Sequence, residues 1–195
     1  METSAIKFPE NVLIIDVYFL NTLIADMEKY YKEKLQRPIE NVNIPYLLDY
    51  LMLDMGVRGK ENKCLVIWVY DAYSEKLALA NPNDIAIDLN GKGFDDNIGY
   101  FEMIGAPCKD LVTRKDLALN ILELTKESKE IKRLGVLPEV SSYDEEVHVK
   151  LSEMKDKGTY TFVLDPAKYA QTESSKAESA LFPILAGMGI QGNEL

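Results

Sequence analysis

Three acidic residues spread along the chain have the chemistry to hold a divalent metal ion together. Asp16 closes an apolar run, Asp116 lies at the start of a predicted helix, and Glu139 follows a second apolar run. Magnesium and manganese prefer carboxylate oxygens, and such an ion can activate water to attack a phosphodiester bond. If the three side chains converge, the sequence predicts a catalytic pocket in which Asp16, Asp116 and Glu139 bind Mg²⁺ or Mn²⁺.

Each of these acids also has a structural explanation. Acids are common at helix starts and strand ends, because carboxylates accept backbone N–H bonds and suit the helix dipole. Thr113 and Asp116 have the spacing of a capping box, which suffices to explain Asp116. Asp71 and Asp165 also close apolar runs, and for both a structural role is favoured over catalysis. Asp16 stands out because it ends the first strand, where α/β sheets carry their sites.

Other kinds of catalytic site have no support in the residues. His148 is the single histidine and lies within a predicted helix, so no histidine triad or zinc motif can be built around it. Cys64 and Cys108 have no Cys-x-x-Cys neighbour that would favour a reactive thiolate. The glycine patterns of dinucleotide-binding and P-loop proteins are missing from the sequence.

The composition limits the partners that the chain can bind. Of its 195 residues 47% are hydrophobic and 28% are charged, which is typical of one globular domain. The net charge is −10, and the richest basic stretches are interleaved with glutamates. Tight, sequence-independent binding to long nucleic acids is therefore disfavoured, because it requires lysine and arginine to neutralise phosphates.

The sequence predicts a cytoplasmic protein that does not insert into membranes. No apolar run approaches the ~18 residues that a membrane span needs. Residues 1–7 lack the basic start and apolar stretch of a signal peptide. We expect both cysteines to be reduced thiols, as is usual in the cytosol.

Hydrophobic periodicity and turn signals predict strands that alternate with helices. The expected strands are 12–17, 64–70, 133–137 and 160–164, and the expected helices are 19–36, 43–55, 113–129 and 142–157, with a last helix from 175. Ser142 with Glu145, and Ser175 with Glu178, have capping-box spacing that would open the last two helices. Residues 72–108 are expected to form an irregular insertion or hairpin, with short strands at 85–87 and 100–104.

This order predicts a single α/β domain over residues 1–195. We expect three layers, with a mostly parallel, Rossmann-like central sheet and helices on both faces. Several of the eleven tyrosines fall on the first two predicted helices: Tyr30, Tyr31, Tyr46 and Tyr50. They could stack on bases, although a helix packing face or a dimer interface explains them more simply.

Several short segments resemble the NYN branch of the PIN-like nuclease superfamily. Residues 12–16 are similar to its first strand and first metal-binding aspartate, and residues 114–119 to the helix entry that carries its second acid. Residues 134–141 are similar to the strand that leads into its S-G-D-x-D motif, and residues 158–164 to the strand that follows. The whole chain also resembles an uncharacterised bacterial family of similar length.

The chain departs from the NYN pattern at several metal-site positions. Phe19 stands where the family has an asparagine, and Asn21 lies nearby. Glu139 replaces the first aspartate of the S-G-D-x-D motif, and Ser141 replaces the second. The resemblance thus leaves Asp16, Asp116 and Glu139 as a minimal acidic trio.

Three functions follow as hypotheses. The first is a degenerate, non-catalytic interaction or assembly module that binds a protein partner or another copy of itself. The second is a divergent Mg²⁺- or Mn²⁺-dependent ribonuclease that cleaves RNA with the acidic trio. The third is a small-molecule binder at the carboxyl rim of the sheet, which a deep pocket lined by Tyr18, Trp68 or Tyr70 would favour.

Overall fold

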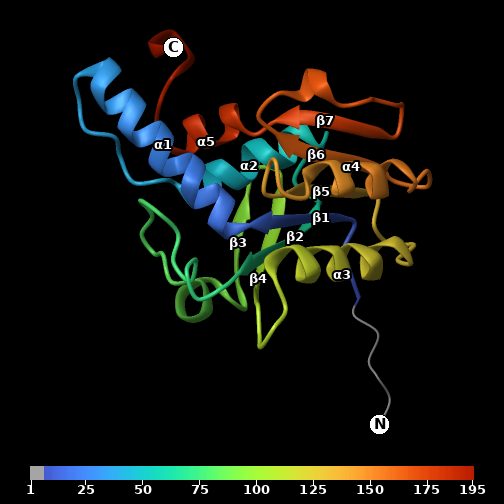
Figure 1. Cartoon of the computed structure of the whole chain (residues 1–195). Coiled ribbons are helices and arrows are strands. Elements are labelled where there is room, and N and C mark those ends of the chain that lie inside the picture. Colours follow the sequence, from blue (N-terminus) through green and yellow to red (C-terminus); the bar gives the residue numbers. More distant parts are fainter. Residues whose placement is uncertain (1–6) are drawn as a thin grey trace.

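The computed structural model describes residues 7–195. The prediction that the chain has no signal peptide rests on residues 1–7, and all of these except residue 7 lie outside the described residues. A seven-stranded sheet forms the centre of the molecule (Figure 1). Its strands are β1 (Asn11–Asp16), β2 (Lys63–Tyr70), β3 (Lys92–Asp96), β4 (Gly99–Pro107), β5 (Arg133–Leu137), β6 (Gly158–Val163) and β7 (Ser175–Ser179). The helices are α1 (Val17–Leu35), α2 (Ile44–Asp54), α3 (Arg114–Lys126), α4 (Asp144–Ser152) and α5 (Leu181–Gly187).

The strands lie in the order β3-β4-β2-β1-β5-β6-β7. All neighbours are parallel except β3 and β4, which form an antiparallel hairpin at one edge. Without β3, the remaining six strands have the order of a doubly wound, Rossmann-like sheet. The predicted α/β fold with a mostly parallel sheet is confirmed.

Helices cover both faces of this sheet, which gives three layers. Leu13 and Ile15 of β1 belong to the core under α1, α2 and α5, whereas Val12 and Ile14 belong to the core under α3 and α4. All six residues of β1 are buried, as expected for a central strand that packs helices on both sides. Among residues 7–195, no helix has the length and apolarity that crossing a membrane requires.

Most of the expected elements are present close to their expected bounds. The helix expected at 19–36 is α1, and the helix expected at 43–55 is α2, where the Asn43 side chain accepts a hydrogen bond from the backbone N–H of Tyr46. The strand expected at 133–137 is β5. The Thr113–Asp116 capping box forms at the start of α3 as expected.

Three local predictions were wrong. Residues 175–179 form strand β7, in which Ser175 and Ala177 are buried while Lys176 is exposed, because the segment pairs with β6. The Ser142–Glu145 capping box is not formed, since α4 begins at Asp144, and the Asp144 carboxylate accepts the N–H of Ser141. Residues 85–87, where a short strand was expected, belong to a π-helical turn (Ile85–Leu89) that Asp84 caps.

The β3–β4 hairpin lies within residues 72–108, where an irregular insertion or hairpin was expected, and β4 contains the short strand expected at 100–104. Strand β4 pairs in parallel with the whole of β2, so it extends the sheet rather than standing apart from it. Cys64 lies buried in β2 and Cys108 follows β4, and both are free thiols. Burial raises the pKa of the Cys64 thiol to about 12, which keeps it protonated and unreactive at neutral pH.

Candidate functional site

The strand register gathers three acidic side chains at the carboxyl edge of the sheet. Strand β1 lies between β2 and β5, with Asp16 paired to Val69 and Ile15 paired to Leu137. Asp71 and Glu139 each lie two residues beyond these paired positions, so both sit beside Asp16. This is the point where the strand order reverses direction, and it is the usual ligand-binding crevice of doubly wound folds.

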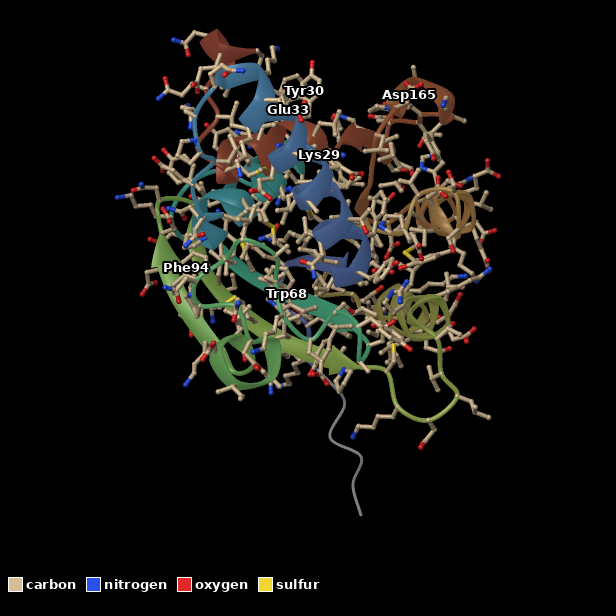
Figure 2. All side chains as sticks on the ribbon, turned by 60° about the vertical axis from the view of Figure 1, so that its left-hand side comes forward. Lys29, Tyr30, Glu33, Trp68, Phe94 and Asp165 are labelled. Atoms are coloured by element: carbon tan, nitrogen blue, oxygen red, sulfur yellow. The ribbon has the colours of Figure 1, made fainter. Side chains whose placement is uncertain are left out.

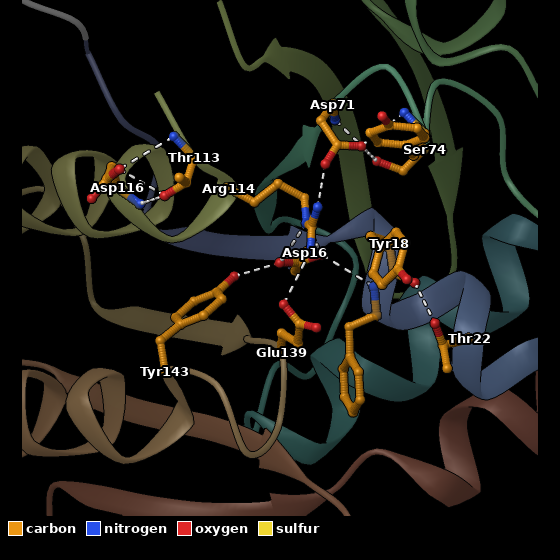
Figure 3. A network of polar contacts seen from close by, with 12 residues as sticks. Asp16, Tyr18, Thr22, Asp71, Ser74, Thr113, Arg114, Asp116, Glu139 and Tyr143 are labelled. Atoms are coloured by element: carbon orange, nitrogen blue, oxygen red, sulfur yellow. Dashed lines mark hydrogen bonds and ion pairs between the residues drawn. The ribbon is translucent and has the colours of Figure 1, made fainter. Parts of the chain in front are cut away.

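The guanidinium of Arg114 lies in the middle of these carboxylates (Figure 3). Its Nε is 3.2 Å from Asp16 Oδ1 and its Nη2 is 3.1 Å from Glu139 Oε2, while its Nη1 donates to Asp71 Oδ2. The guanidinium carbon also lies 4.3 Å from the centre of the Tyr18 ring, a cation–π distance. One cation therefore connects the ends of β1, β2 and β5 through charge-assisted hydrogen bonds. We call Asp16, Asp71, Glu139 and Arg114 the Arg114 cluster.

Asp16 is the most deeply buried acid of the Arg114 cluster, with 1% of its surface exposed. Its Oδ1 accepts the backbone N–H of Phe19 at 3.1 Å, which caps the start of α1. Its Oδ2 accepts the hydroxyl of Tyr143 at 2.7 Å. Burial, together with the negative charge of Asp16, raises the pKa of Tyr143, so the phenol stays protonated and keeps donating.

Asp71 is held by its own turn as well as by Arg114. Its Oδ1 accepts the hydroxyl of Ser74 and the backbone N–H of Tyr73, each at 2.9 Å. Burial alone would raise the pKa of Asp71, but the hydrogen bonds from Ser74, Arg114 and Tyr73 lower it below its usual value. Conversely, burial would lower the pKa of Arg114, but Asp16, Asp71 and Glu139 raise it. Both directions favour the charged forms of Asp71 and Arg114 at neutral pH.

Asp116 does not join the Arg114 cluster. Its Oδ2 accepts the hydroxyl of Thr113 at 2.7 Å and the backbone N–H of Thr113 at 3.2 Å. These hydrogen bonds lower its pKa, and the side chain stays exposed at the first turn of α3. In Figure 3 the Asp116 carboxylate faces Thr113, away from Asp16. Of the predicted trio, the structure thus joins Asp16 and Glu139 through one cation and leaves Asp116 in its capping role.

A hollow of about 440 Å³ opens beside the Arg114 cluster and is lined by Asp71, Val112, Thr113, Arg114, Lys115, Glu139 and Ser142. None of the aromatic residues expected for a deep ligand pocket lines it. Trp68 is fully buried in the core beneath α1 (Figure 2). Among residues 7–195, no three His, Cys, Asp or Glu side chains are arranged to hold a metal ion.

The other acids and the histidine considered in the sequence have structural surroundings. Asp165 accepts the N–H of Ala167 and caps a short 3₁₀ turn after β6. His148 is buried, and its ring nitrogens lie 2.9 Å from Thr161 Oγ1 and 2.6 Å from the carbonyl oxygen of Ala170. A carbonyl oxygen can only accept, so Nε2 carries the proton and His148 anchors the segment between β6 and β7 to α4.

Sequence reasoning did not assign the central role to Arg114, and it gave Asp71 a structural role. Asp71 carried a usable signal, because it closes a strand that was expected to lie in the same parallel sheet as Asp16. Arg114 is the first residue of α3, at the edge where the acids were expected to meet. The positive charge of Arg114 at that position could have indicated that the carboxylates form ion pairs within the chain instead of binding a metal.

The comparison with protein families places the chain among proteins whose function is unknown. A model of the family of unknown function DUF6621 matches residues 5–195. The chain belongs to the DUF6621 family. No curated protein and no solved structure matches the chain. For this DUF6621 member, function must therefore be argued from the Arg114 cluster and the surfaces around it.

Proposed function

We propose that this DUF6621 protein is a PIN/NYN-like domain that lacks catalysis and works in the cytoplasm as an interaction or assembly module. The observation that carries the proposal is the position of the Arg114 guanidinium, which bonds to Asp16, Asp71 and Glu139. A divalent ion would have to occupy this same space to be shared by these carboxylates. In our proposal the guanidinium is a built-in cation that takes the place of a metal and locks the strand ends together.

Two further observations support a structural role for this edge. Ser141 stands at the position where the resemblance would require a second aspartate, and its backbone has a φ of +67°. Its N–H donates to Asp144 Oδ1 at 2.8 Å, so the turn before α4 is stabilised by a hydrogen bond within the protein. Asp144 in turn accepts the hydroxyl of Tyr169, which leaves its oxygens engaged within the protein.

The ribonuclease alternative rests on the hollow beside Arg114. Arg114 and Lys115 line it together with Asp71 and Glu139, so a phosphate could meet positive charge there. For catalysis, however, Arg114 would have to leave three carboxylates that are each within hydrogen-bond distance. The small-molecule alternative is disfavoured because none of Tyr18, Trp68 and Tyr70 lines this hollow, whereas a typical ligand pocket has an aromatic lining.

An RNA-cleavage assay separates the module from the ribonuclease. Wild-type protein and Asp16→Asn are incubated with single-stranded and structured RNA in Mg²⁺ or Mn²⁺. We expect the two proteins to show the same background rate, because no metal-activated water is formed at the Arg114 cluster. Metal-dependent cleavage by the wild type that Asp16→Asn abolishes would refute the proposal, whereas cleavage that persists in Asp16→Asn would identify a contaminant.

A further inference from the structure

Two acidic side chains face each other where helix α2 meets the β3–β4 hairpin. The helix and the hairpin lie on the same side of the sheet, because Leu48 of α2 and Phe101 of β4 are buried in one core (Figure 1). Asp49 follows Leu48 on α2, and its carboxylate lies within hydrogen-bonding reach of Asp96, the last residue of β3. We call Asp49 and Asp96 the acid pair.

The acid pair has no basic partner within the part of the chain that the structure describes. Neither Asp49 nor Asp96 belongs to any of the ion pairs formed by residues 7–195. Asp49 Oδ1 is closed to solvent, and no described N–H or O–H group donates to it. A polar atom that is buried without a hydrogen bond costs free energy, so the pair needs a donor.

A proton on Asp49 supplies that donor. Two ionised carboxylates only accept hydrogen bonds, so the contact between them becomes a hydrogen bond when one of them is protonated. Asp96 Oδ1 already accepts the backbone N–H of Asn97, which suits Asp96 as the acceptor and Asp49 as the donor. The pKa of Asp49 supports this assignment, because burial, followed by the charge of Asp96 and the hydrogen bond with it, raises it from its usual 3.8 to about 6.

We propose that the acid pair is a proton-dependent clasp, which holds the β3–β4 hairpin against α2 in acid and releases it as the pH rises to neutrality. With Asp49 protonated, one hydrogen bond joins the helix to the end of β3. Once Asp49 loses its proton, two like charges face each other in a partly buried place and repel. Strand β3 is at the edge of the sheet and pairs with β4 on one side, so it is the element that yields.

The other titratable groups around Asp49 leave the acid pair as the group that titrates. From β2, the Cys64 thiol lies close enough for the charge of Asp49 to act on it, and burial keeps that thiol protonated. Asp54, at the end of α2, also has a pKa of about 6, but there burial and Glu178 of β7 raise the value and Arg58 lowers it. The charge that raises the pKa of Asp49 comes from β3 instead.

The pH dependence of the clasp has a definite sign. Because the pKa of Asp49 is raised in the closed hairpin, the contribution of the clasp is fully present below 3.8 and is lost as the pH rises to about 6. From about pH 5 to about pH 7.5, the equilibrium constant for opening the hairpin should therefore increase ~5–10-fold. The lower figure allows for solvent screening, since Asp49 is only partly buried.

Amide hydrogen exchange of the full chain at the two pH values tests the clasp, with each rate corrected for the intrinsic exchange rate at that pH. In the wild type we expect the protection of the β3 amides to fall ~5–10-fold at the higher pH. Asp49→Asn and Asp96→Asn each place an NH₂ donor within the acid pair, so β3 should be equally protected at both pH values. Asp54→Asn is the matched control, because it removes a carboxyl of similar pKa from the same helix.

The outcomes of this comparison separate the clasp from a general effect of pH. A loss of β3 protection that occurs in the wild type and Asp54→Asn, and is absent from Asp49→Asn and Asp96→Asn, supports the clasp. Equal protection of wild-type β3 at both pH values overturns it, and so does a loss that persists in Asp49→Asn or that Asp54→Asn abolishes. These results are independent of metal binding and RNA cleavage, so a failure here is distinguishable from a failure of the proposed function.

Discussion

Replacing Arg114 with methionine is expected to lower the free energy of unfolding by about 3 kcal/mol, near the low end for breaking a buried charge cluster. Methionine keeps much of the length and apolar volume of the side chain but removes the guanidinium. Asp16, Asp71 and Glu139 would then face one another without a cation, and Asp16 is almost completely buried. Urea denaturation followed by circular dichroism measures the change.

Lys115→Met is the matched control for this substitution. Lys115 is the next residue of α3, and its Nζ lies 2.8 Å from Glu146 Oε2 in an exposed ion pair. Exposed pairs contribute about 0–1 kcal/mol, so this variant should stay close to wild type. Equal effects of the two substitutions would contradict a special role for Arg114.

The pH dependence of the Arg114→Met effect has a definite sign. Because the pKa of Asp71 is lowered in the folded state, its contribution is fully present above its unfolded pKa of ~3.9 and is lost as the pH falls through the lower, folded pKa. Methionine removes one cause of that lowering. The stability difference between wild type and variant should thus be large at neutral pH and shrink in acid, where Asp71 takes up a proton. A difference that stays constant down to acidic pH would contradict this explanation.

Replacing Asp16 with asparagine is expected to destabilise the protein by roughly 2–3 kcal/mol. The amide can still accept the N–H of Phe19, so the cap of α1 survives. It cannot neutralise Arg114, and its NH₂ group would face the Arg114 Nε donor. Asp16→Ala should cost about 1 kcal/mol more, because the cap is lost as well.

Asp165→Asn provides the comparison with another acid at a strand end. Asp165 caps a short turn and pairs with Lys168 on the surface, so its replacement should change stability by no more than about 0.5 kcal/mol. Thermal melts of the three variants give the ranking. If Asp16→Asn were as well tolerated as Asp165→Asn, the Arg114 cluster would not hold the strand ends together.

The sequence was sufficient to predict that acids gather at one edge of the sheet. Asp16 and Glu139 follow short apolar runs, and parallel strands end on the same edge, so their approach follows from the fold class. Asp71 also closes an apolar run, but which of these acids lie side by side depends on the strand order, which is a property of the whole sheet. The capping box was correctly read for Asp116, and that role directs its carboxylate to Thr113.

Predictions failed where pairing between distant segments overrides a local pattern. Ser175 and Glu178 have capping-box spacing, yet the segment lies against β6, and strand pairing determines its conformation. The role of Arg114 is of the same kind, because a long side chain from the first turn of α3 reaches carboxylates on three strand ends. No spacing of residues along the chain predicts which carboxylates this side chain contacts.

The most direct test of the central claim is a calorimetric titration of Mn²⁺, and then Mg²⁺, into wild-type protein, Asp16→Asn and Arg114→Met. If the guanidinium takes the place of the metal, the wild type shows no saturable binding, and Arg114→Met gains a site once its carboxylates move inward to share an ion. Saturable binding to the wild type that disappears in Asp16→Asn would contradict the account, because it would show that a metal enters the cluster while Arg114 is present.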